Sequence, residues 1–445
     1  MAVGKNGLIT ALDIGSTKVC CFIARPDGSG GVRVIGIGHQ IARGMRAGTV
    51  VDMDAAEEAV RGAVDAAERM AKERVDSVLL SFSGGRPASR LIDVETDIAG
   101  HEIGERDLKR ALAQAHLLAR RSAEGREILN VIPAGYCIDG TPGFREPRGM
   151  YGSRLGLRLH VVSAEVGPLR NLKLLAERCH LDISALVVAP YASGMSTLVE
   201  DEIDLGVTLI DLGGGTTDVA VFYDGHMVHT DQVPVGGNHV TNDIARGLST
   251  SAAHAERLKT LHGSAVAGPD DEHAMVSVPR VGESGADAMQ QIPRSMLIGI
   301  IQPRIEETLE LVRDRLQASG LARTAGRRAV LTGGGALLTG VREHAARVLD
   351  KQVRVGRPLG VHGLAEATEG PAFAAAAGLL AYLDRGAGQG TMETMVEEYL
   401  AFARGESTIS YPYRGQLHTL TLQPEGERSV ENSDGERAVL RRVDI

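Results

Sequence analysis

The fold is decided by the stretch Asp211-Leu212-Gly213-Gly214-Gly215-Thr216-Thr217-Asp218, which echoes a shorter stretch near the N-terminus, Asp13-Ile14-Gly15-Ser16-Thr17. Each stretch lies between two apolar runs, so each predicts a strand, a tight turn and a second strand. Glycine in such a turn lets backbone amides approach a ligand closely, and successive amides form a cradle for anions. One copy alone is equally compatible with a structural hairpin, but two copies indicate a duplicated phosphate-binding turn.

The two leading aspartates imply a cation as well as a phosphate ligand. Asp13 and Asp211 would repel a triphosphate and each other unless a divalent cation lay among them. The hard oxygen chemistry of Mg²⁺ suits carboxylate, water and phosphate together. The sequence therefore predicts a site for a nucleotide and Mg²⁺.

Length and composition agree with a large α/β protein of several domains. A chain of 445 residues is too long for one core and predicts two to four domains. The 57 acidic residues outnumber the 48 basic ones, which argues against nonspecific binding of nucleic acid. The four cysteines lack metal-type spacing and are expected to be reduced, mostly buried thiols. No apolar run approaches the roughly 20 residues that span a bilayer, so no segment is expected to cross a membrane.

A third glycine cluster, Leu331-Thr332-Gly333-Gly334-Gly335-Ala336, follows a predicted strand and precedes a predicted helix at 338–349. A strand, glycine turn and helix start suits close approach of a sugar or base. It is not a Walker A loop, because Val341 stands where that motif requires lysine. No G-x-G-x-x-G fingerprint occurs either, which disfavours a dinucleotide-binding domain. A purely structural helix start remains the alternative for this cluster.

These motifs resemble, in sequence order, the superfamily of actin, heat-shock chaperones and sugar kinases. The matching motifs are Asp13 to Lys18, Pro190-Tyr191-Ala192-Ser193-Gly194, Asp211 to Asp218 and Gly333 to Gly335. Within the superfamily the chain is most similar to the FtsA family of bacterial cell-division proteins. That resemblance is carried by 8–18, Val233-Pro234-Val235-Gly236-Gly237-Asn238-His239, 255–259 and 301–316, and it covers about residues 8–383. It implies an actin-like, two-lobed α/β fold of duplicated ribonuclease-H-like subdomains with a small inserted α/β subdomain.

The helix and strand pattern, taken with this resemblance, divides the chain into six parts. In order, they are 1–85, the start of the first lobe with phosphate loop 1; 86–164, the inserted subdomain; 165–206, the rest of the first lobe with a connecting helix; 207–355, the second lobe with phosphate loop 2 and the nucleoside loop; 356–385, a return helix to the first lobe; and 386–445, a flexible C-terminal tail. The region 263–294 is rich in Gly, Asp, Pro and Ser, and is either a surface insertion or a set of strands.

The resemblance also implies roles for individual residues at an ATP and Mg²⁺ site. The β and γ phosphates would lie between Gly15, Ser16, Thr17 and Lys18 on one side and Gly213, Gly214, Gly215, Thr216 and Thr217 on the other, with Asp13 and Asp211 orienting the water shell of Mg²⁺. Gly236 and Gly237 would add backbone amides, Glu256 and Lys259 would flank ribose or adenine, and Gly333, Gly334, Gly335 and Ala336 would hold the nucleoside. Two alternatives stay open. Lys18 would otherwise be a solvated strand residue, and Glu256 and Lys259 an ordinary surface ion pair.

In function, the resemblance implies a division protein that binds ATP, polymerises and ties FtsZ filaments to the inner face of the cytoplasmic membrane at the septum. Its expected partners are the FtsZ C-terminal peptide, further copies of itself and later division proteins. Arg294 and Arg304 beside a long predicted helix would suit an acidic peptide, although exposed arginines are usually just solvated. Hydrolysis is expected to be weak or absent, because Ala185 stands where actin has a glutamine. The alternatives are an ATPase or phosphotransferase of the same fold, or a pilus-assembly paralogue.

The C-terminal tail departs from the pattern of the resembling family, whose members end in a basic amphipathic helix at the membrane surface. Here 436–445 is short, lacks aromatic residues and includes two acids. A helical stripe of apolar residues at 392–400 is interrupted by Glu393, Glu397 and Glu398, which anionic lipid would repel. That stripe favours a core or partner contact. Peripheral membrane contact is therefore implied by the resemblance and not by these residues.

Overall fold

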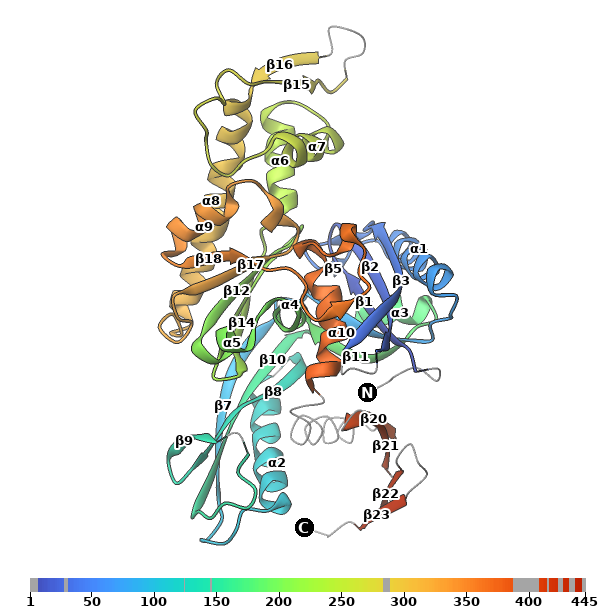
Figure 1. The fold of residues 1–445 in the computed structure, drawn as a ribbon, viewed down its shortest axis with the longest axis vertical. Coiled ribbons are helices and arrows are strands. Elements are labelled where there is room, and N and C mark those ends of the chain that lie inside the picture. The colour runs from blue at the N-terminus through green and yellow to red at the C-terminus, as the bar shows by residue number, and fades with distance from the viewer. Residues whose placement is uncertain are drawn as a thin grey trace.

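The computed structural model of the chain describes residues 7–27, 31–123, 125–144, 146–282 and 289–386, and, by their backbone, four strands between 408 and 441. It shows two lobes that share one sheet topology and an inserted subdomain below them (Figure 1).

The first lobe is built on a six-stranded sheet in the order β11-β6-β1-β2-β3-β19. These strands are β1 (Ile9–Ile14), β2 (Lys18–Pro26), β3 (Val32–Ile41), β6 (Ser77–Phe82), β11 (Asp182–Val188) and β19 (Val361–His362). β1, β2 and β3 form an antiparallel meander, whereas β6 pairs parallel to both β1 and β11. The sheet is accompanied by α1 (Met53–Ala71) and α3 (Val166–Arg178), and by a short hairpin of β4 (Met45–Arg46) and β5 (Thr49–Val50). Asp52 caps α1 by accepting a hydrogen bond from the Ala55 amide, and Lys72 ends it in a left-handed conformation.

The second lobe repeats this plan in the order β14-β13-β12-β17-β18. The strands are β12 (Val207–Leu212), β13 (Thr217–Tyr223), β14 (His226–Val233), β17 (Arg328–Thr332) and β18 (Gln352–Val355). Again an antiparallel meander of three strands continues into two parallel ones. The helices of this lobe are α6 (Gly237–Gly247), α7 (Ala252–His262), α8 (Arg294–Ala318) and α9 (Val341–Leu349). The predicted duplication of an actin-like α/β unit is confirmed.

The inserted subdomain is an antiparallel sheet in the order β7-β10-β8-β9, with one helix packed on it. Its elements are β7 (Ala88–Asp97), α2 (Glu105–Ser122), β8 (Arg126–Ile138), β9 (Thr141–Phe144) and β10 (Arg154–Glu165). Leu108, Leu112 and Ala115 of α2 join Leu157 and Leu159 of β10 in a core of its own. This part therefore has its own sheet and its own apolar centre, as a small α/β insert requires.

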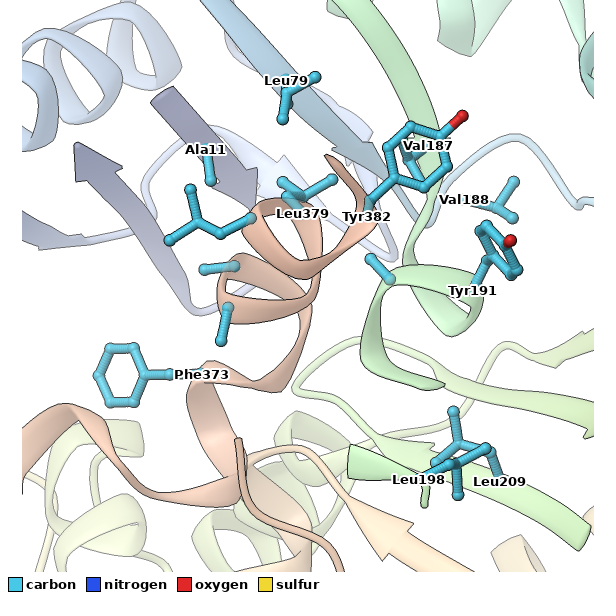
Figure 2. Packing of buried hydrophobic residues seen from close by; sticks show 14 of the residues in the cluster. Ala11, Leu79, Val187, Val188, Tyr191, Leu198, Leu209, Phe373, Leu379 and Tyr382 are labelled. Carbon is cyan, nitrogen blue, oxygen red and sulfur yellow. The ribbon is translucent and has the colours of Figure 1, made fainter. Parts of the chain in front are cut away.

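Two helices cross between the lobes. They are α4 (Ala189–Thr197), which leads through α5 (Glu200–Leu205) into the second lobe, and α10 (Ala374–Gly386), which returns from it after the turns η3 (Glu366–Thr368) and η4 (Pro371–Phe373). The crossing is close enough that a Cβ on Gly378 would lie 1.7 Å from the Ala192 carbonyl oxygen. Tyr191 stacks on Phe222 at 6.4 Å between ring centroids and meets the edge of Tyr382 at 5.9 Å. Figure 2 shows this shared core, in which residues of both helices pack beside strands of both lobes.

The region 263–294 contains an antiparallel hairpin of β15 (Met275–Pro279) and β16 (Met289–Pro293), so the second of the two alternatives for it holds. It lies at the far end of the second lobe beyond α6 and α7 (Figure 1). Four more strands follow α10, namely β20 (Thr408–Tyr413), β21 (Gln416–Leu422), β22 (Glu427–Glu431) and β23 (Arg437–Arg441), and they pair as a meander that the sequence did not predict. The expected flexibility of the tail stays a prediction, and the apolar stripe at 392–400 lies outside the described residues. Of the helices that are described, none combines the length and apolar character needed to cross a bilayer.

A candidate nucleotide site between the lobes

A cavity of about 430 Å³ lies where the two hairpins meet, within the size range of small-molecule sites. Almost every residue predicted for the nucleotide site lines it, from both lobes: Asp13, Gly15, Ser16, Thr17, Lys18, Asp211, Gly213, Gly214, Gly215, Thr216, Thr217, Gly236, Gly237, Glu256, Lys259, Gly333, Gly334 and Gly335. Ala336 is the exception, because it is buried in the turn η2 (Gly334–Leu337), 5% exposed, and is not among the lining residues.

The two glycine turns abut each other across the cavity. A Cβ on Gly214 would lie 2.2 Å from Cγ2 of Thr17, and a Cβ on Gly215 would lie 2.5 Å from Oγ of Ser16. No side chain fits at either glycine without separating the turns. Ser16 Oγ is also fixed, since it accepts a hydrogen bond from the Gly48 amide at 2.8 Å.

The start of α6 is held against the second turn. The amides of Gly237 and Asn238 donate to the carbonyl oxygens of Gly213 and Gly214, at 2.9 and 2.8 Å. A Cβ on Gly236 would lie 2.6 Å from the same Gly213 oxygen, so glycine is required for this approach. The Gly236 amide is engaged as well, since it donates to His239 Nδ1 at 3.1 Å. The start of α6 thus borders the cavity, but the Gly236 and Gly237 amides, which were expected to face phosphates, are already bonded within the protein.

Three carboxyl groups crowd one end of the cavity. Asp13 accepts a hydrogen bond from Ser81 Oγ at 2.5 Å, and Asp211 accepts one from Ser193 Oγ at 2.6 Å. Asp218 is 5% exposed and accepts a hydrogen bond from Gln232 Nε2 at 2.7 Å. Burial raises the pKa of Asp13, and burial together with the nearby Asp13 raises the pKa of Asp211 to about 6. Burial and the neighbouring Asp211 hold the pKa of Asp218 well above its ordinary value.

Carboxylates placed this close together suit a hydrated divalent cation bound beside them. Burial raises the pKa values of all three groups, and repulsion adds to the pKa of Asp211 and Asp218; a divalent cation would favour the charged carboxylates against both effects. Within the described part of the chain, no three His, Cys, Asp or Glu side chains converge so as to hold a metal ion by themselves. Mg²⁺ beside Asp13 and Asp211 would thus rely on water and phosphate oxygens for its remaining ligands, which is the coordination that this ion commonly keeps.

Lys18 belongs to the cavity wall. Its ammonium donates to the Ala372 carbonyl oxygen and lies 3.5 Å from the ring centroid of Phe373, a cation–π arrangement. Burial lowers the pKa of Lys18, although Asp13 and Asp211 act in the opposite direction. The residue is half-buried, which disfavours the alternative of a solvated strand lysine.

A polar network on α6 and α7 also lines the cavity. Lys259 Nζ lies 2.6 Å from Glu256 Oε2, donates to the Gly237 carbonyl oxygen at 3.2 Å and lies 2.9 Å from Thr241 Oγ1. The two residues do form an i, i+3 ion pair, but that pair is joined to the helix start that borders the cavity. On the facing side Gly333 has φ +80, and a Cβ there would lie 2.2 Å from Asp211 Oδ1. The third glycine cluster is therefore packed directly on the second hairpin.

Several residues that line the cavity, or that bond its aspartates from behind, were not predicted. Asp218 closes the second quoted stretch and Ser193 lies in the motif before it, so both were visible as motif members without an assigned role. Ser81 and Gln232 carried no local signal, because they meet Asp13 and Asp218 only through sheet pairing. The remaining unpredicted lining residues are Ser83, Ala189, Leu212, Asn238, Val240, Thr260, Gly263, Ile305, Thr308, Leu337, Leu338, Thr339, Pro371, Ala372 and Ala375.

Three predicted positions lie away from the cavity. Ala185 is in β11 and is packed against the shared core. Arg294 bonds Asp271 at 2.6 Å and the His262 carbonyl oxygen at 2.8 Å. Arg304 bonds Asp243 at 2.5 Å and also contacts Glu307. Both arginines are about 30% exposed, so an acidic peptide would have to compete with these internal partners.

Comparison with known proteins places the same regions in one family. A family model described as "Cell division protein FtsA" matches residues 208–378, and one described as "SHS2 domain inserted in FTSA" matches residues 84–163. A "Cell division protein FtsA" of Agrobacterium fabrum is 47% identical over 388 residues, which cover 85% of this chain and 87% of that protein.

Solved structures with much lower identity share the fold. A PilM-PilN type IV pilus biogenesis complex matches with a TM-score of 0.60 at 16% identity, covering 84% of this chain and 97% of that one. MreB 5 of Spiroplasma citri bound to AMPPNP matches with a TM-score of 0.50 at 14% identity, covering 90% of this chain and 100% of that one. At these identities the likeness concerns the actin-like architecture alone.

Proposed function

This chain belongs to the FtsA family of cell division proteins, and from that premise we propose that it is an ATP-dependent filament adaptor. In this proposal it binds ATP with Mg²⁺, polymerises, and tethers FtsZ filaments to the inner face of the cytoplasmic membrane at the septum. Later division proteins would join the same assembly. The membrane contact would be peripheral.

The observation that supports the proposal most is the meeting of two glycine turns, one from each lobe, around a single cavity. A ligand held by both turns would link the lobes, so its presence would change the shape of the whole molecule. The contacts between copies in a filament would then depend on nucleotide. This is the property that an adaptor needs and that a simple scaffold lacks.

The donor set suits a nucleoside triphosphate. Backbone amides of the two turns would surround the phosphates, and Lys18 would add a positive charge after leaving the Ala372 oxygen. The cavity wall holds Asp13, Asp211, Asp218 and Glu256 against Lys18 and Lys259, so a phosphate ligand would need a cation to bind there. Mg²⁺ held by water between Asp13, Asp211 and the phosphates would supply it.

Hydrolysis would be slow or absent. Attack on the terminal phosphate needs a polar group that orients water. The actin glutamine is replaced by Ala185, which packs into the core. The nucleotide would accordingly serve as a structural ligand that sets filament geometry.

Binding of the FtsZ C-terminal peptide is proposed for the second lobe, with Arg294 and Arg304 as candidate contacts. An acidic peptide would replace their present bonds to Asp271 and Asp243, so binding should weaken as salt rises.

The test is cosedimentation of the purified chain with FtsZ filaments in the presence of ATP and Mg²⁺, using FtsZ with and without its C-terminal peptide. The adaptor predicts sedimentation only with the peptide, stimulation by ATP, and little phosphate release. ATP binding without FtsZ association would leave the nucleotide site standing and remove the adaptor function. Rapid release of phosphate to water or to an acceptor would favour the ATPase or phosphotransferase alternative.

A further inference from the structure

One strand of the second lobe, β14, touches both the nucleotide cavity and the hinge of the inserted subdomain. At one end, Gln232 Nε2 donates to Asp218 Oδ1 at 2.7 Å, and Asp218 lines the cavity. The same amide nitrogen donates to the Ser83 carbonyl oxygen, at the point where β6 of the first lobe ends. One side chain thus joins the cavity to the opposite lobe.

The other attachment lies two to three residues earlier on β14, at Thr230 and His229. The Thr230 amide donates to Ser89 Oγ at 3.0 Å, and the same hydroxyl lies 3.1 Å from His229 Nδ1. Ser89 is at the start of β7, the first strand of the insert. β14 is the edge strand of its sheet and packs along β7, β8 and β10, as Figure 1 shows. Ser89 therefore satisfies a backbone donor that an edge strand would otherwise leave open.

The segment between the two attachments connects β6 to the insert and is called the hinge. It runs from Ser83 through Gly84 and Gly85 to Ser89 and is the N-terminal connection of the insert. Gly85 has φ +66, which favours glycine. A Cβ on Gly84 would lie 2.2 Å from the Gly48 carbonyl oxygen, so this connection passes too close to Gly48 for a side chain. Because both ends of this segment are fastened to β14, movement of one lobe relative to the other would pull directly on the insert.

We propose that Gln232 is a positioning residue, which holds Asp218 and the Ser83 carbonyl together and so couples closure of the nucleotide cleft to the orientation of the insert. The proposal rests on the proposed nucleotide function. In it, the Gln232 bridge seen here belongs to the closed cleft, ATP–Mg²⁺ favours that closed form, and the intact bridge fixes the hinge and the insert. Gln232 contacts no phosphate in this arrangement and acts through Asp218 and Ser83.

The test is amide hydrogen exchange of the full chain with ATP–Mg²⁺, with ADP–Mg²⁺ and without nucleotide. In the native chain we expect ATP to slow exchange in the two hairpins and also at 86–91. In Gln232→Ala, at saturating ATP, slowing should persist in the hairpins and disappear at 86–91, and ATP affinity should fall about tenfold because two hydrogen bonds are lost. The control is Gln352→Ala, at the other edge of the same sheet. There ATP should slow exchange both in the hairpins and at 86–91, as in the native chain.

A second variant keeps the proposal testable if Gln232→Ala does not fold. Ser89→Ala removes the attachment at the insert but no cavity contact, so it should leave ATP affinity unchanged and abolish the slowing at 86–91. Slowing at 86–91 that survives in either folded variant would overturn the proposal. Absence of slowing in the hairpins of the native chain would overturn the nucleotide function itself and this proposal with it.

Discussion

Gly214 of the second hairpin faces Thr17 of the first so closely that a Cβ at position 214 would lie 2.2 Å from Thr17 Cγ2. The two residues belong to different lobes, and both line the cavity. This close approach of the two turns therefore depends on the absence of a side chain at position 214, as it does at Gly215.

The first prediction is that Gly214→Ala prevents full closure of the cleft. The added methyl would force the hairpins apart, and ATP affinity should fall at least about tenfold while the fold of each lobe is kept. Gly299→Ala is the matched control, because Gly299 is exposed in α8 and a Cβ there meets nothing within 4 Å. Titration calorimetry with ATP–Mg²⁺ measures both. Native affinity in Gly214→Ala would show that the two turns need not touch when nucleotide is bound.

The second prediction concerns pH. The folded chain without ligand holds the pKa of Asp211 at about 6, above its ordinary value of 3.8. Between these two values the folded state binds more protons than the unfolded state, so this group makes stability fall as pH rises through the window. Asp211→Asn should remove that contribution. Urea unfolding of both proteins from about pH 4 to about pH 7 should show the native chain losing stability relative to the variant.

The third prediction is that stabilisation of the protein by ATP–Mg²⁺ depends on pH through the same carboxyl cluster. Protons and Mg²⁺ compete for Asp13 and Asp211, so stabilisation by ATP–Mg²⁺ should be larger above the Asp211 pKa of about 6 than below it. Removal of Mg²⁺ by a chelator should abolish most of this difference. The thermal shift caused by ATP is measured at one pH above the Asp211 pKa and at one pH below it, each with and without the chelator. Equal shifts in all four conditions would place the cation elsewhere.

How far the sequence predicts this structure depends on the range of the signal. The hairpins, their glycines and the leading aspartates are local sequence patterns. In the structure these same residues line one cavity. Partners that meet through the sheet carry no such pattern: Gln232 reaches Asp218 only because β13 and β14 pair in one register. The hairpin of β15 and β16 was left open because Met289–Pro293 reads MQQIP, which is too polar to show the alternation of a buried strand.

The fourth prediction is that Gly378→Ala destabilises the protein at the crossing of α4 and α10. A Cβ on Gly378 would lie 1.7 Å from the Ala192 carbonyl oxygen, and neither helix backbone can yield easily inside a packed core. We expect a loss of about 1 to 3 kcal/mol in the free energy of unfolding. Gly167→Ala is the control, since a Cβ on Gly167 in α3 meets nothing within 4 Å. Denaturant unfolding compares the two, and equal stability would mean that the helices separate at no cost.

The last prediction separates the two lysines of the cavity by their distance from the phosphates. Lys18 is proposed to serve the β and γ phosphates, so Lys18→Met should weaken ATP about tenfold or more and ADP by less. Lys259 is bonded to Glu256 and Thr241 and is proposed to flank ribose or adenine, so Lys259→Met should weaken ATP and ADP equally, by a few fold. Competition with a fluorescent nucleotide gives all four affinities in one format. Since both substitutions remove one charge of the same kind from one cavity, each serves as the control for the other. Equal discrimination between ATP and ADP in the two variants would contradict the assignment of Lys18 to the phosphate end.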